Sequence, residues 1–439
     1  MSRIRLTWPR LIMLAIALVV VFAAVVAWLN VRGEDVDVLE GAVGLSTPDQ
    51  VARGAYLARA GNCAACHTDR GGAPYAGGKG IVTPFGTVFA SNLTPDTKTG
   101  IGNWTPMLFW RALHNGRSAD GRLLYPAFPY PNFTEITRAD SDALFAFLRT
   151  QVPVAQPNRA HALSFPYDLQ ASLAVWRALF FTPGVYEPVV EQSVQWNRGA
   201  YLVRALGHCS ACHSPRNRFG ATTDSLEFSG GLIPMQNWYA PSLASTSEAG
   251  VADWPTQDVA ALFKTGITPR GAAMGPMAEV VFRSTQYLDD DDIAAMTVFL
   301  KTLPPTAPHD RSDVGPGAAV NARGEALYRD RCAACHGPHG EGGARVRADG
   351  GASPGADGVA YVPLAGNRLV QLASPANLVH VIVNGGFAPT TGGNPRPFGM
   401  PPFGPSMKDE DIAAVATYVR NAWGNAAPEV SALDVYSAR

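Results

Sequence analysis

Three five-residue stretches decide the class of this protein. They read Cys63-Ala64-Ala65-Cys66-His67, Cys209-Ser210-Ala211-Cys212-His213 and Cys332-Ala333-Ala334-Cys335-His336. Together they use all six cysteines of the 439-residue chain. Cys-x-x-Cys-His is the attachment pattern of c-type haem, in which both thiols bond to the porphyrin and the adjacent histidine ligates the iron. The sequence therefore predicts three covalently bound haem c groups.

Paired cysteines also occur in disulfides, thioredoxin-like redox sites and zinc sites. A thioredoxin-like motif would not occur three times with a histidine after each pair, and zinc would need a fourth ligand for each motif. We therefore expect haem at every motif. The predicted attachment residues are Cys63, Cys66, Cys209, Cys212, Cys332 and Cys335, and the predicted proximal iron ligands are His67, His213 and His336.

The composition is typical of small packed domains and does not indicate a nucleic-acid-binding protein. Apolar residues make up 47% of the chain, charged residues 16%, and the formal net charge is −1. The chain has no excess of basic residues, so its charge does not indicate nucleic-acid binding. The 44 glycines and 35 prolines predict much irregular structure between short helices.

The N-terminus carries a basic and then an apolar segment. Arg3, Arg5 and Arg10 precede an uninterrupted apolar run over residues 11–29. Such a run is long enough to cross a bilayer, and the preceding arginines put the N-terminus in the cytoplasm and the haem domains in the periplasm. A cleaved signal peptide is the alternative, with Val25-Val26-Ala27 as its cleavage site. We favour a retained single-pass anchor in the cell inner membrane.

The chain contains three internal repeats. Each repeat begins just before a haem motif, as Arg53-Gly54-Ala55-Tyr56-Leu57, Arg198-Gly199-Ala200-Tyr201-Leu202 or Arg323-Gly324-Glu325-Ala326-Leu327. Each ends on a segment with an acidic start and an apolar face, at residues 140–148, 290–300 and 409–419, which predicts a final helix. This order is typical of the class I cytochrome c fold. We expect an all-α protein of three tandem class I cytochrome c domains behind an N-terminal transmembrane helix.

The expected domain boundaries follow from these repeats and from the proline-rich stretches between them. The segment in 153–190 includes an apolar stretch at 169–181 that we expect to be helical, either packing between domains or contacting a membrane or partner. The predicted units are an anchor or signal segment at 1–32, domain 1 at 48–152, a linker at 153–190, domain 2 at 191–304, a Pro-rich linker at 305–317, domain 3 at 318–427 and a tail at 428–439.

A sixth ligand for each iron should lie in the loop before the final helix. In domain 2 we favour Met277, which follows Pro276, over Met274. In domain 3 we favour Met400 over Met407, which lies at the onset of the final helix and is expected to pack in the core. Methionine ligation raises the potential of a haem relative to histidine ligation.

Domain 1 departs from this pattern because the equivalent segment reads Tyr125-Pro126-Ala127-Phe128-Pro129. Phenylalanine cannot ligate iron, and Met107 lies within an apolar helix where it is expected to pack. His114 ends that helix. It either interacts with the helix C-terminal carbonyls or serves as the sixth ligand of haem 1; a five-coordinate iron is the third alternative.

The chain resembles the tri-haem cytochrome c subunits of membrane-bound periplasmic dehydrogenases, a family that includes the alcohol, aldehyde, gluconate and sorbitol dehydrogenase subunits. The resemblance covers residues 48–427. Its motifs are Arg53-Gly54-Ala55-Tyr56-Leu57, Ser91-Asn92-Leu93-Thr94-Pro95-Asp96, Gly100-Ile101-Gly102-Asn103-Trp104, Leu124-Tyr125-Pro126-Ala127, Trp196-Asn197-Arg198-Gly199, Gly275-Pro276-Met277-Ala278-Glu279-Val280 and Met400-Pro401-Pro402-Phe403.

The resemblance implies a chain that takes electrons from a dehydrogenase catalytic subunit and passes them to ubiquinone or a terminal oxidase. Family members of the alcohol and gluconate type have methionine where Phe128 stands. The variant with Phe128 and His114 is more similar to cytochromes that accompany molybdenum hydroxylases of aldehydes or N-heteroaromatic compounds. A quinoprotein or flavoprotein dehydrogenase is the alternative partner.

Two other functions stay open from the residues. One is the cytochrome subunit of a terminal oxidase, and the other is a di-haem-peroxidase-like enzyme, which the missing methionine of domain 1 would permit. No nucleophile motif, P-loop or G-x-G-x-x-G accompanies the haem motifs. We therefore expect no substrate-oxidising site in this chain.

Overall fold

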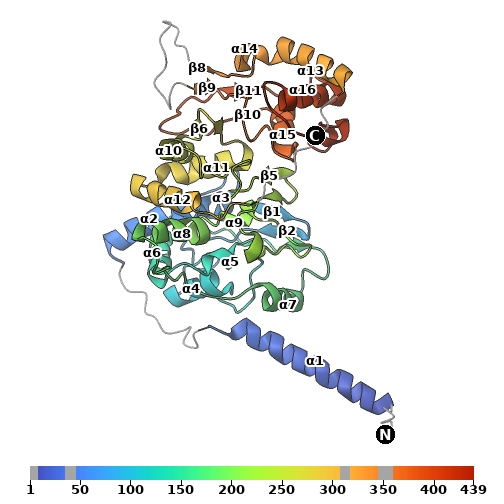
Figure 1. The fold of residues 1–439 in the computed structure, drawn as a ribbon. Coiled ribbons are helices and arrows are strands. Elements are labelled where there is room, and N and C mark those ends of the chain that lie inside the picture. The colour runs from blue at the N-terminus through green and yellow to red at the C-terminus, as the bar shows by residue number, and fades with distance from the viewer. Residues whose placement is uncertain (1–7, 35–45, 307–316, 345–358) are drawn as a thin grey trace.

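The computed structural model describes residues 8–34, 46–306, 317–344 and 359–439 (Figure 1). Helices predominate in this part of the chain, and short strands lie between groups of them. The helices are α1 (Trp8–Val31), α2 (Pro48–Ala60), α3 (Cys63–His67), α4 (Pro106–Asn115), α5 (Tyr130–Phe133), α6 (Arg138–Arg149), α7 (Gln170–Phe180), α8 (Val194–Tyr201), α9 (Ser210–His213), α10 (Thr256–Thr265), α11 (Gly275–Arg283), α12 (Asp290–Lys301), α13 (Ala318–Arg331), α14 (Ala333–His336), α15 (Ala376–Asn384), α16 (Asp409–Asn421) and α17 (Ala432–Tyr436).

The remaining helical elements are one π-helix, η1 (Leu202–Leu206), and two 3-10 helices, η2 (Asp224–Leu226) and η3 (Thr285–Tyr287). The strands are two to four residues long and lie in the loops. They are β1 (Gly80–Thr83), β2 (Gly86–Phe89), β3 (Ala162–Leu163), β4 (Gly231–Ile233), β5 (Trp238–Ala240), β6 (Ile267–Thr268), β7 (Gly271–Ala272), β8 (Gly343–Ala344), β9 (Val359–Tyr361), β10 (Gly386–Phe387) and β11 (Gly399–Met400).

Three helix pairs form the framework, namely α2 with α6, α8 with α12 and α13 with α16. Each haem motif follows the first helix of a pair, with η1 lying between α8 and the second motif. The helices of each pair cross closely at the glycine of the repeated Arg-Gly motif. A Cβ at this position would overlap a carbonyl oxygen of the opposite helix, so the close crossing requires glycine. The glycine and the carbonyl residue are Gly54 and Ala143, Gly199 and Ala295, and Gly324 and Ala414.

Capping residues and acidic first turns set the starts of these helices. The side chains of Thr47, Thr137 and Ser193 accept hydrogen bonds from the backbone at the starts of α2, α6 and α8. Helices α12 and α16 each begin with three acidic residues, which interact favourably with the helix N-terminus. The final helix expected in each repeat is therefore present.

The first two segments share one hydrophobic core, whereas the third segment has its own. Leu57 and Phe145 of the first segment belong to the same buried cluster as Leu206 and Phe299 of the second. The buried residues of the third segment form two further clusters around α13, α15, α16 and α17. In Figure 1 the third segment lies at the end of the body farthest from α1.

The connection at 153–190 folds back on the first segment. Its strand β3 pairs with β2, with Gly86 opposite Leu163, and completes the sheet β1-β2-β3. The side chain of Asn158 accepts a hydrogen bond of 2.7 Å from the backbone of Asn92. The helix expected at 169–181 is α7.

Helix α1 projects from the body and is long and apolar enough to cross a membrane (Figure 1). Its residues are exposed except near the C-terminal end, where Asn30 is buried. There Nδ2 of Asn30 donates to the carbonyl of Ala174 in α7 at 2.9 Å. The end of α1 is thereby tied to the connection between the first two segments.

Two other segments were predicted outside the three domains, a Pro-rich linker at 305–317 and a tail at 428–439. Most of the Pro-rich linker at 305–317 falls outside the described residues. The tail at 428–439 contains α17, which packs on α15 and α16 and buries Val430 and Val435. Arg439 donates to Asp409 at 2.6 Å, so the tail is part of the third segment's packing.

Candidate haem-binding sites

The three motif histidines adopt the same arrangement. Each ends a short helix, α3, α9 or α14, and each presents Nδ1 to a backbone carbonyl oxygen. The distances from Nδ1 are 2.7 Å for His67 to Ser91, 2.7 Å for His213 to Pro241 and 3.2 Å for His336 to Val362. Because a carbonyl only accepts, Nδ1 carries the proton and Nε2 keeps a lone pair for a metal.

Burial keeps these imidazoles neutral. It lowers the pKa of His67, His213 and His336 below the ordinary histidine value, and the carbonyl hydrogen bonds act in the opposite direction. A neutral imidazole with its Nδ1 proton held by a carbonyl is the form in which histidine ligates a metal. The residues present therefore fit an iron ligand at each motif.

The six cysteines are free of disulfides. Burial raises the pKa of the first cysteine thiol of each motif, to about 12 for Cys63, about 12 for Cys209 and about 11 for Cys332. Burial at these positions disfavours a charged sulfur and suits an uncharged one. A thioether to a haem vinyl group is uncharged, so the sulfur environment also fits haem c.

Two tyrosines interlock the first segment with the second. The hydroxyl of Tyr56 donates to Asp292 at 2.5 Å, and the hydroxyl of Tyr201 donates to Asp140 at 2.6 Å. Each tyrosine belongs to the first helix of one segment, and each aspartate to the first turn of the final helix of the other. The two contacts are therefore reciprocal, as expected for a pseudo-two-fold arrangement of the first two repeats.

Each interlocking aspartate also pairs with an arginine of its own segment. Nε of Arg53 lies 2.7 Å from Oδ1 of Asp140, and Nε of Arg198 lies 2.8 Å from Oδ1 of Asp292. Burial acts to raise the pKa of Asp292, but its hydrogen bonds from Arg198 and Tyr56 outweigh burial and lower it. The carboxylate is thus held ionised between two segments.

The turns before the first two haem motifs face each other. His208, directly before Cys209, is half-buried and hydrogen-bonds with the backbone of Gly61, two residues before Cys63. Ser284 of the second segment donates to the carbonyl of Ala60 at 3.2 Å. In the reciprocal contact, Asn132 of the first segment donates to the carbonyl of Arg204 at 3.0 Å. These contacts bring the first two Cys-x-x-Cys-His motifs into one neighbourhood.

The predicted distal methionines lie at different elements. Met277 lies in α11 and packs against the shared core, while Met400 lies in β11 and packs against the third segment's core. Met407 contacts both clusters of the third segment, in agreement with a packing role. No described contact joins Met277 or Met400 to a motif histidine, and their ligation stays a prediction.

Met274 contacts the third segment. A Cβ at Gly386 would lie 3.1 Å from the methyl carbon of Met274, and Gly386 pairs with Met400 across β10 and β11. The loop that holds Met274 and Met277 therefore abuts the hairpin that holds Met400. The second and third segments meet through their candidate distal-ligand loops, whereas the first two meet through their haem motifs.

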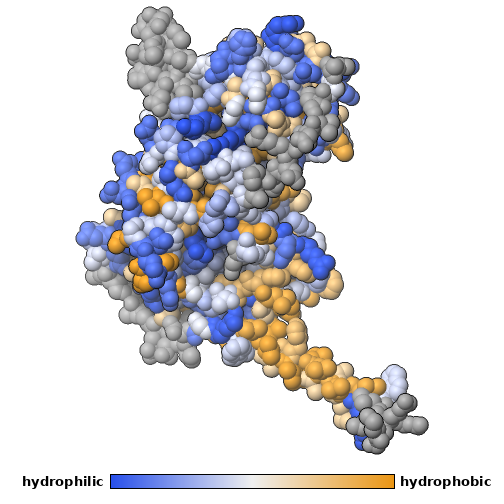
Figure 2. Space-filling model, viewed as in Figure 1, coloured by the Kyte–Doolittle hydropathy of each residue, from blue (hydrophilic) through white to orange (hydrophobic). Residues whose placement is uncertain are grey.

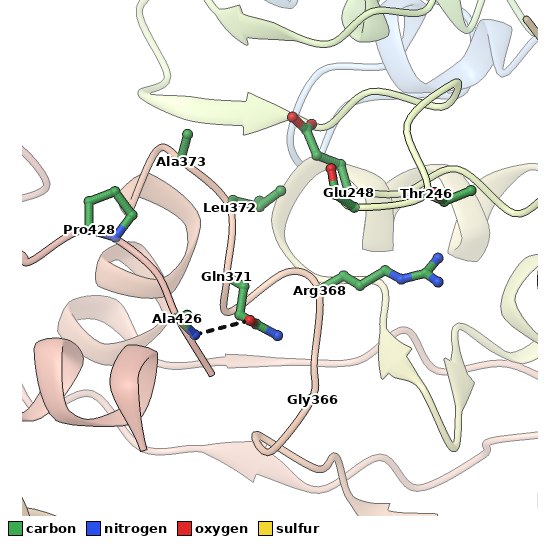
Figure 3. A pocket seen from close by; sticks show the side chains of 10 residues that line it. Thr246, Glu248, Gly366, Arg368, Gln371, Leu372, Ala373, Ala426 and Pro428 are labelled. Carbon is green, nitrogen blue, oxygen red and sulfur yellow. Dashed lines mark hydrogen bonds between the residues drawn. The ribbon is translucent and has the colours of Figure 1, made fainter. Parts of the chain in front are cut away.

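A polar groove also lies between the second and third segments (Figure 3). Thr246 and Glu248 line one side, and Arg368 and Gln371 line the other. Glu248 accepts a hydrogen bond from the backbone of Ser242 at 2.6 Å. No motif cysteine, motif histidine or candidate methionine lines the groove. It is a feature of the interface and separate from the candidate haem sites.

His114 is buried at the end of α4 and its ring is fixed on two sides. Nδ1 lies 2.7 Å from the carbonyl oxygen of Thr134, and the ring stacks on Trp110 with a centroid separation of 4.4 Å. The carbonyl partner belongs to the residue after α5, not to the C-terminus of α4 itself. This geometry repeats the Nδ1 arrangement of the three motif histidines.

The other residues considered in the first segment pack elsewhere. Phe128 lies against the shared core, with its ring 5.4 Å from that of Phe133. The sulfur of Met107 accepts a hydrogen bond from Arg138 at 3.4 Å. Met107 is half-buried and is not a member of the shared core, so the structure does not place it in the core where the sequence predicted it.

Paired helices that each lead into a Cys-x-x-Cys-His motif with an oriented histidine define a c-type cytochrome. A family model described as cytochrome c matches residues 51–151 and 321–423. The chain is 38% identical to the cytochrome c subunit of alcohol dehydrogenase (quinone) from Gluconacetobacter polyoxogenes, over 91% of this chain and 87% of that protein.

Two further relatives have similar identities. The gluconate 2-dehydrogenase cytochrome c subunit of Pantoea cypripedii is 36% identical, over 89% of each chain. A nicotinate dehydrogenase subunit from Pseudomonas putida is 37% identical over 89% of this chain, which matches 32% of that longer protein. The chain belongs to the family of dehydrogenase cytochrome c subunits.

Sequence reasoning did not find the interlocking tyrosines. The signal was present, since Tyr56 and Tyr201 occupy the same position in the first two repeats and Ala326 replaces them in the third. The aspartate partners also recur, as the acidic starts of the final helices. Only the relative placement of the segments identifies which aspartate each tyrosine contacts.

Proposed function

We propose that the chain is a tri-haem electron carrier built from three tandem class I cytochrome c domains, at 48–152, 191–304 and 318–427. The observation that carries the proposal is the identical arrangement of His67, His213 and His336, each with Nδ1 on a backbone carbonyl after a free cysteine pair. The three helix crossings over Gly54, Gly199 and Gly324 support one all-α fold repeated three times, with the short strands confined to loops.

The haems supply one-electron redox chemistry when bound, and the chain's residues hold and orient them. The proposed proximal ligands are His67, His213 and His336, and the proposed distal ligands of the second and third haems are Met277 and Met400. The contact of Met274 with Gly386 supports Met277 over Met274, because Met274 is engaged with the third segment.

For the first haem we propose His114 as the distal ligand. Its Nδ1 bond to Thr134 leaves the imidazole in the same tautomer as the motif histidines. Histidine ligation lowers a haem potential relative to methionine. The first haem would then have the lowest potential and would accept electrons first.

The contacts between segments support a path from the first haem to the second and then to the third. The first two segments share a core and meet at Gly61 and His208, next to both attachment sites. The second and third meet where Met274 contacts Gly386. Successive sites are thus adjacent through packed protein.

The proposed electron donor is the catalytic subunit of a periplasmic dehydrogenase, and the proposed acceptor is ubiquinone or a terminal oxidase. Relatives named for alcohol and gluconate dehydrogenases and for nicotinate dehydrogenase have identities of 38%, 36% and 37%. Phe128 and His114 favour a donor of the molybdenum hydroxylase type over a quinoprotein or flavoprotein. A terminal-oxidase subunit and a haem peroxidase are the alternatives.

We further propose that residues 8–31 are a retained anchor in the inner membrane, with the haem segments in the periplasm. The apolar run over residues 11–29 supports retention, because it is long enough to cross a bilayer and longer than the usual apolar region of a cleaved signal peptide. The mass of the intact mature chain tests both points. It should include the N-terminal segment and three haem additions.

Purification of the native complex from the membrane tests the donor. We expect a catalytic subunit to co-purify and its substrate to reduce the bound haems. Co-purification of a haem–copper oxidase subunit instead, or peroxide turnover by the isolated chain, would favour one of the alternatives. Fewer than three haem additions would contradict the tri-haem carrier.

A further inference from the structure

Helix α7 has the opposite polarity to that of a solvent-exposed surface helix. Its single charged residue, Arg177, is 4% exposed, whereas Leu179 is 67% exposed. Ala171, on the same side as Leu179, is also exposed. A helix on a soluble surface normally turns its charges to water and its apolar residues to the core. The outward face of α7 is therefore suited to an apolar environment.

Arg177 is used inside the protein. Its Nε donates to Oδ1 of Asn30 at 2.9 Å, and its guanidinium lies 4.8 Å from the centre of the Phe181 ring. The only charged side chain of α7 therefore binds the end of α1 and does not face solvent. The burial of this arginine leaves the outer face of α7 uncharged.

Exposed aromatic residues extend this face on both sides of α7. Phe165 and Tyr167 precede the helix, and Phe219 reaches it from the second segment through a 2.9 Å hydrogen bond from Trp176 to the Phe219 carbonyl. Figure 2 shows apolar surface where α1 meets the body. We define the α7 patch as Phe165, Tyr167, Leu169, Trp176, Leu179 and Phe219. An apolar patch of this kind on a folded protein marks an interaction site.

The two tryptophans of α1 indicate the depth at which the α7 patch lies relative to a bilayer. Trp8 and Trp28 are both exposed and are separated by a rise of about 30 Å, which equals the thickness of a hydrocarbon core. Tryptophan prefers the membrane–water interface at both sides of a bilayer. Asn30, which bonds to Ala174 of α7, lies two residues beyond Trp28. Helix α7 is therefore attached at the level of the periplasmic headgroups.

We propose that the α7 patch lies in the interfacial region of the periplasmic leaflet, with phospholipid as its occupant. This proposal rests on the membrane anchorage proposed above. Tyr167 and Trp176 have the amphipathic rings that favour this depth. Arg218, whose guanidinium lies 5.1 Å from the Phe219 ring, is exposed beside the patch and suits an anionic headgroup. The anchor and the patch together fix the tilt of the haem segments against the membrane.

Photocrosslinking of the full-length holoprotein tests the contact. The photoreactive residue p-benzoylphenylalanine would replace Leu179 in one variant and Phe165 in another, and Leu433 in the control, which is 72% exposed on α17 of the third segment. The proteins would be reconstituted in vesicles of phosphatidylethanolamine and phosphatidylglycerol. We expect lipid adducts from the photoreactive residue at positions 179 and 165 and none from position 433.

Two outcomes would overturn the proposal. One is a lipid yield at 179 and 165 no higher than at 433, and the other is adducts formed only with a second copy of the chain or with a companion subunit. Haem content and membrane retention are measured on the same samples. If both stay intact while the lipid adducts are absent, the electron-carrier function stands and only the docking surface is wrong.

Discussion

The hydroxyl of Tyr56 donates a hydrogen bond of 2.5 Å to Oδ2 of Asp292, a residue 236 positions later in the chain. Tyr201 and Asp140 repeat this contact in the opposite direction. The third repeat has Ala326 at the tyrosine position and cannot form it. The first two segments are therefore interlocked by paired tyrosine–aspartate contacts, and the third joins them by a different interface.

Removal of the Tyr56 hydroxyl should weaken this interlock. A hydrogen bond to a charged acceptor contributes about 1.5–3 kcal/mol, so Tyr56→Phe should lower the free energy of unfolding by an amount of that order. Denaturant titration followed by haem absorbance would measure it. The control is Tyr436→Phe, because Tyr436 is exposed on α17. Equal stabilities of the two variants would show that the interlock contributes nothing.

Acid should weaken the same contact. The folded-state pKa of Asp292 lies below the ordinary value of 3.8, because hydrogen bonds from Arg198 and Tyr56 outweigh the effect of burial. A carboxylate with a lowered pKa stabilises the fold above its unfolded pKa, and this contribution is lost as the pH falls through the folded pKa. The stability difference between the native protein and Asp292→Asn should shrink as the pH is lowered towards the folded pKa.

Parallel unfolding titrations of both proteins at several pH values would measure this difference. The matched control is Asp330→Asn, since Asp330 is exposed on α13. A stability difference for Asp292→Asn that stays constant over the acidic range would exclude Asp292 as the source of the pH dependence.

The sequence predicted the local features of the fold. The Arg-Gly repeats and the acidic helix starts predicted the helices that pair in each segment, because capping and amphipathic spacing are local properties. The close crossing at Gly54 was not predicted, since it depends on the position of Ala143. Strands of two to four residues, such as β3, are too short to give a periodic signal.

Long-range contacts explain what could not be predicted. Asn30 reads as the polar end of an apolar run, and nothing in the sequence shows that it would be buried against Ala174 in α7. The shared core of the first two segments likewise requires the two helix pairs to be placed together. At the candidate sites, the motifs predicted which histidines would be oriented, whereas the carbonyl partners Ser91, Pro241 and Val362 come from distant loops.

Replacement of His114 tests the sixth ligand of the first haem. In His114→Ala we expect one haem to lose its low-spin spectrum and to bind an exogenous ligand such as imidazole. The control is Met107→Leu on the same helix, since the Met107 sulfur is engaged by Arg138. Ferric-state absorbance and electron paramagnetic resonance would measure the change. Three unaltered low-spin haems in His114→Ala would remove His114 as a ligand.

Histidine replacement of a distal methionine should lower one haem potential in each case. Because methionine ligation raises the potential relative to histidine, Met277→His and Met400→His should each shift a single, different haem to lower potential. Met274→Leu is the control, since Met274 contacts Gly386 in the third segment. Potentiometric titration would resolve the haems. A shift in Met274→Leu comparable with that in Met277→His would contradict the assignment of Met277.

The close helix crossings make a prediction about three positions at once. A Cβ at Gly54, Gly199 or Gly324 would overlap a carbonyl oxygen of the opposite helix, which is backbone and cannot rotate away. Overpacking in a tightly packed interior costs about 1–3 kcal/mol, so each glycine-to-alanine change should destabilise the protein by at least that order. The control is Gly184→Ala, where a Cβ would meet no atom within 4 Å.

Gly184 does not have a positive φ, so alanine there should be neutral or should stabilise by about 0.4–1 kcal/mol through a less flexible unfolded chain. Thermal unfolding and haem content would be measured for all four variants. If the three segments share one fold, the three helix-crossing variants should behave alike, each losing stability or haem at its own segment. Retention of full stability by Gly324→Ala, with losses in Gly54→Ala and Gly199→Ala, would show that the third segment does not have the crossing on which its haem site depends.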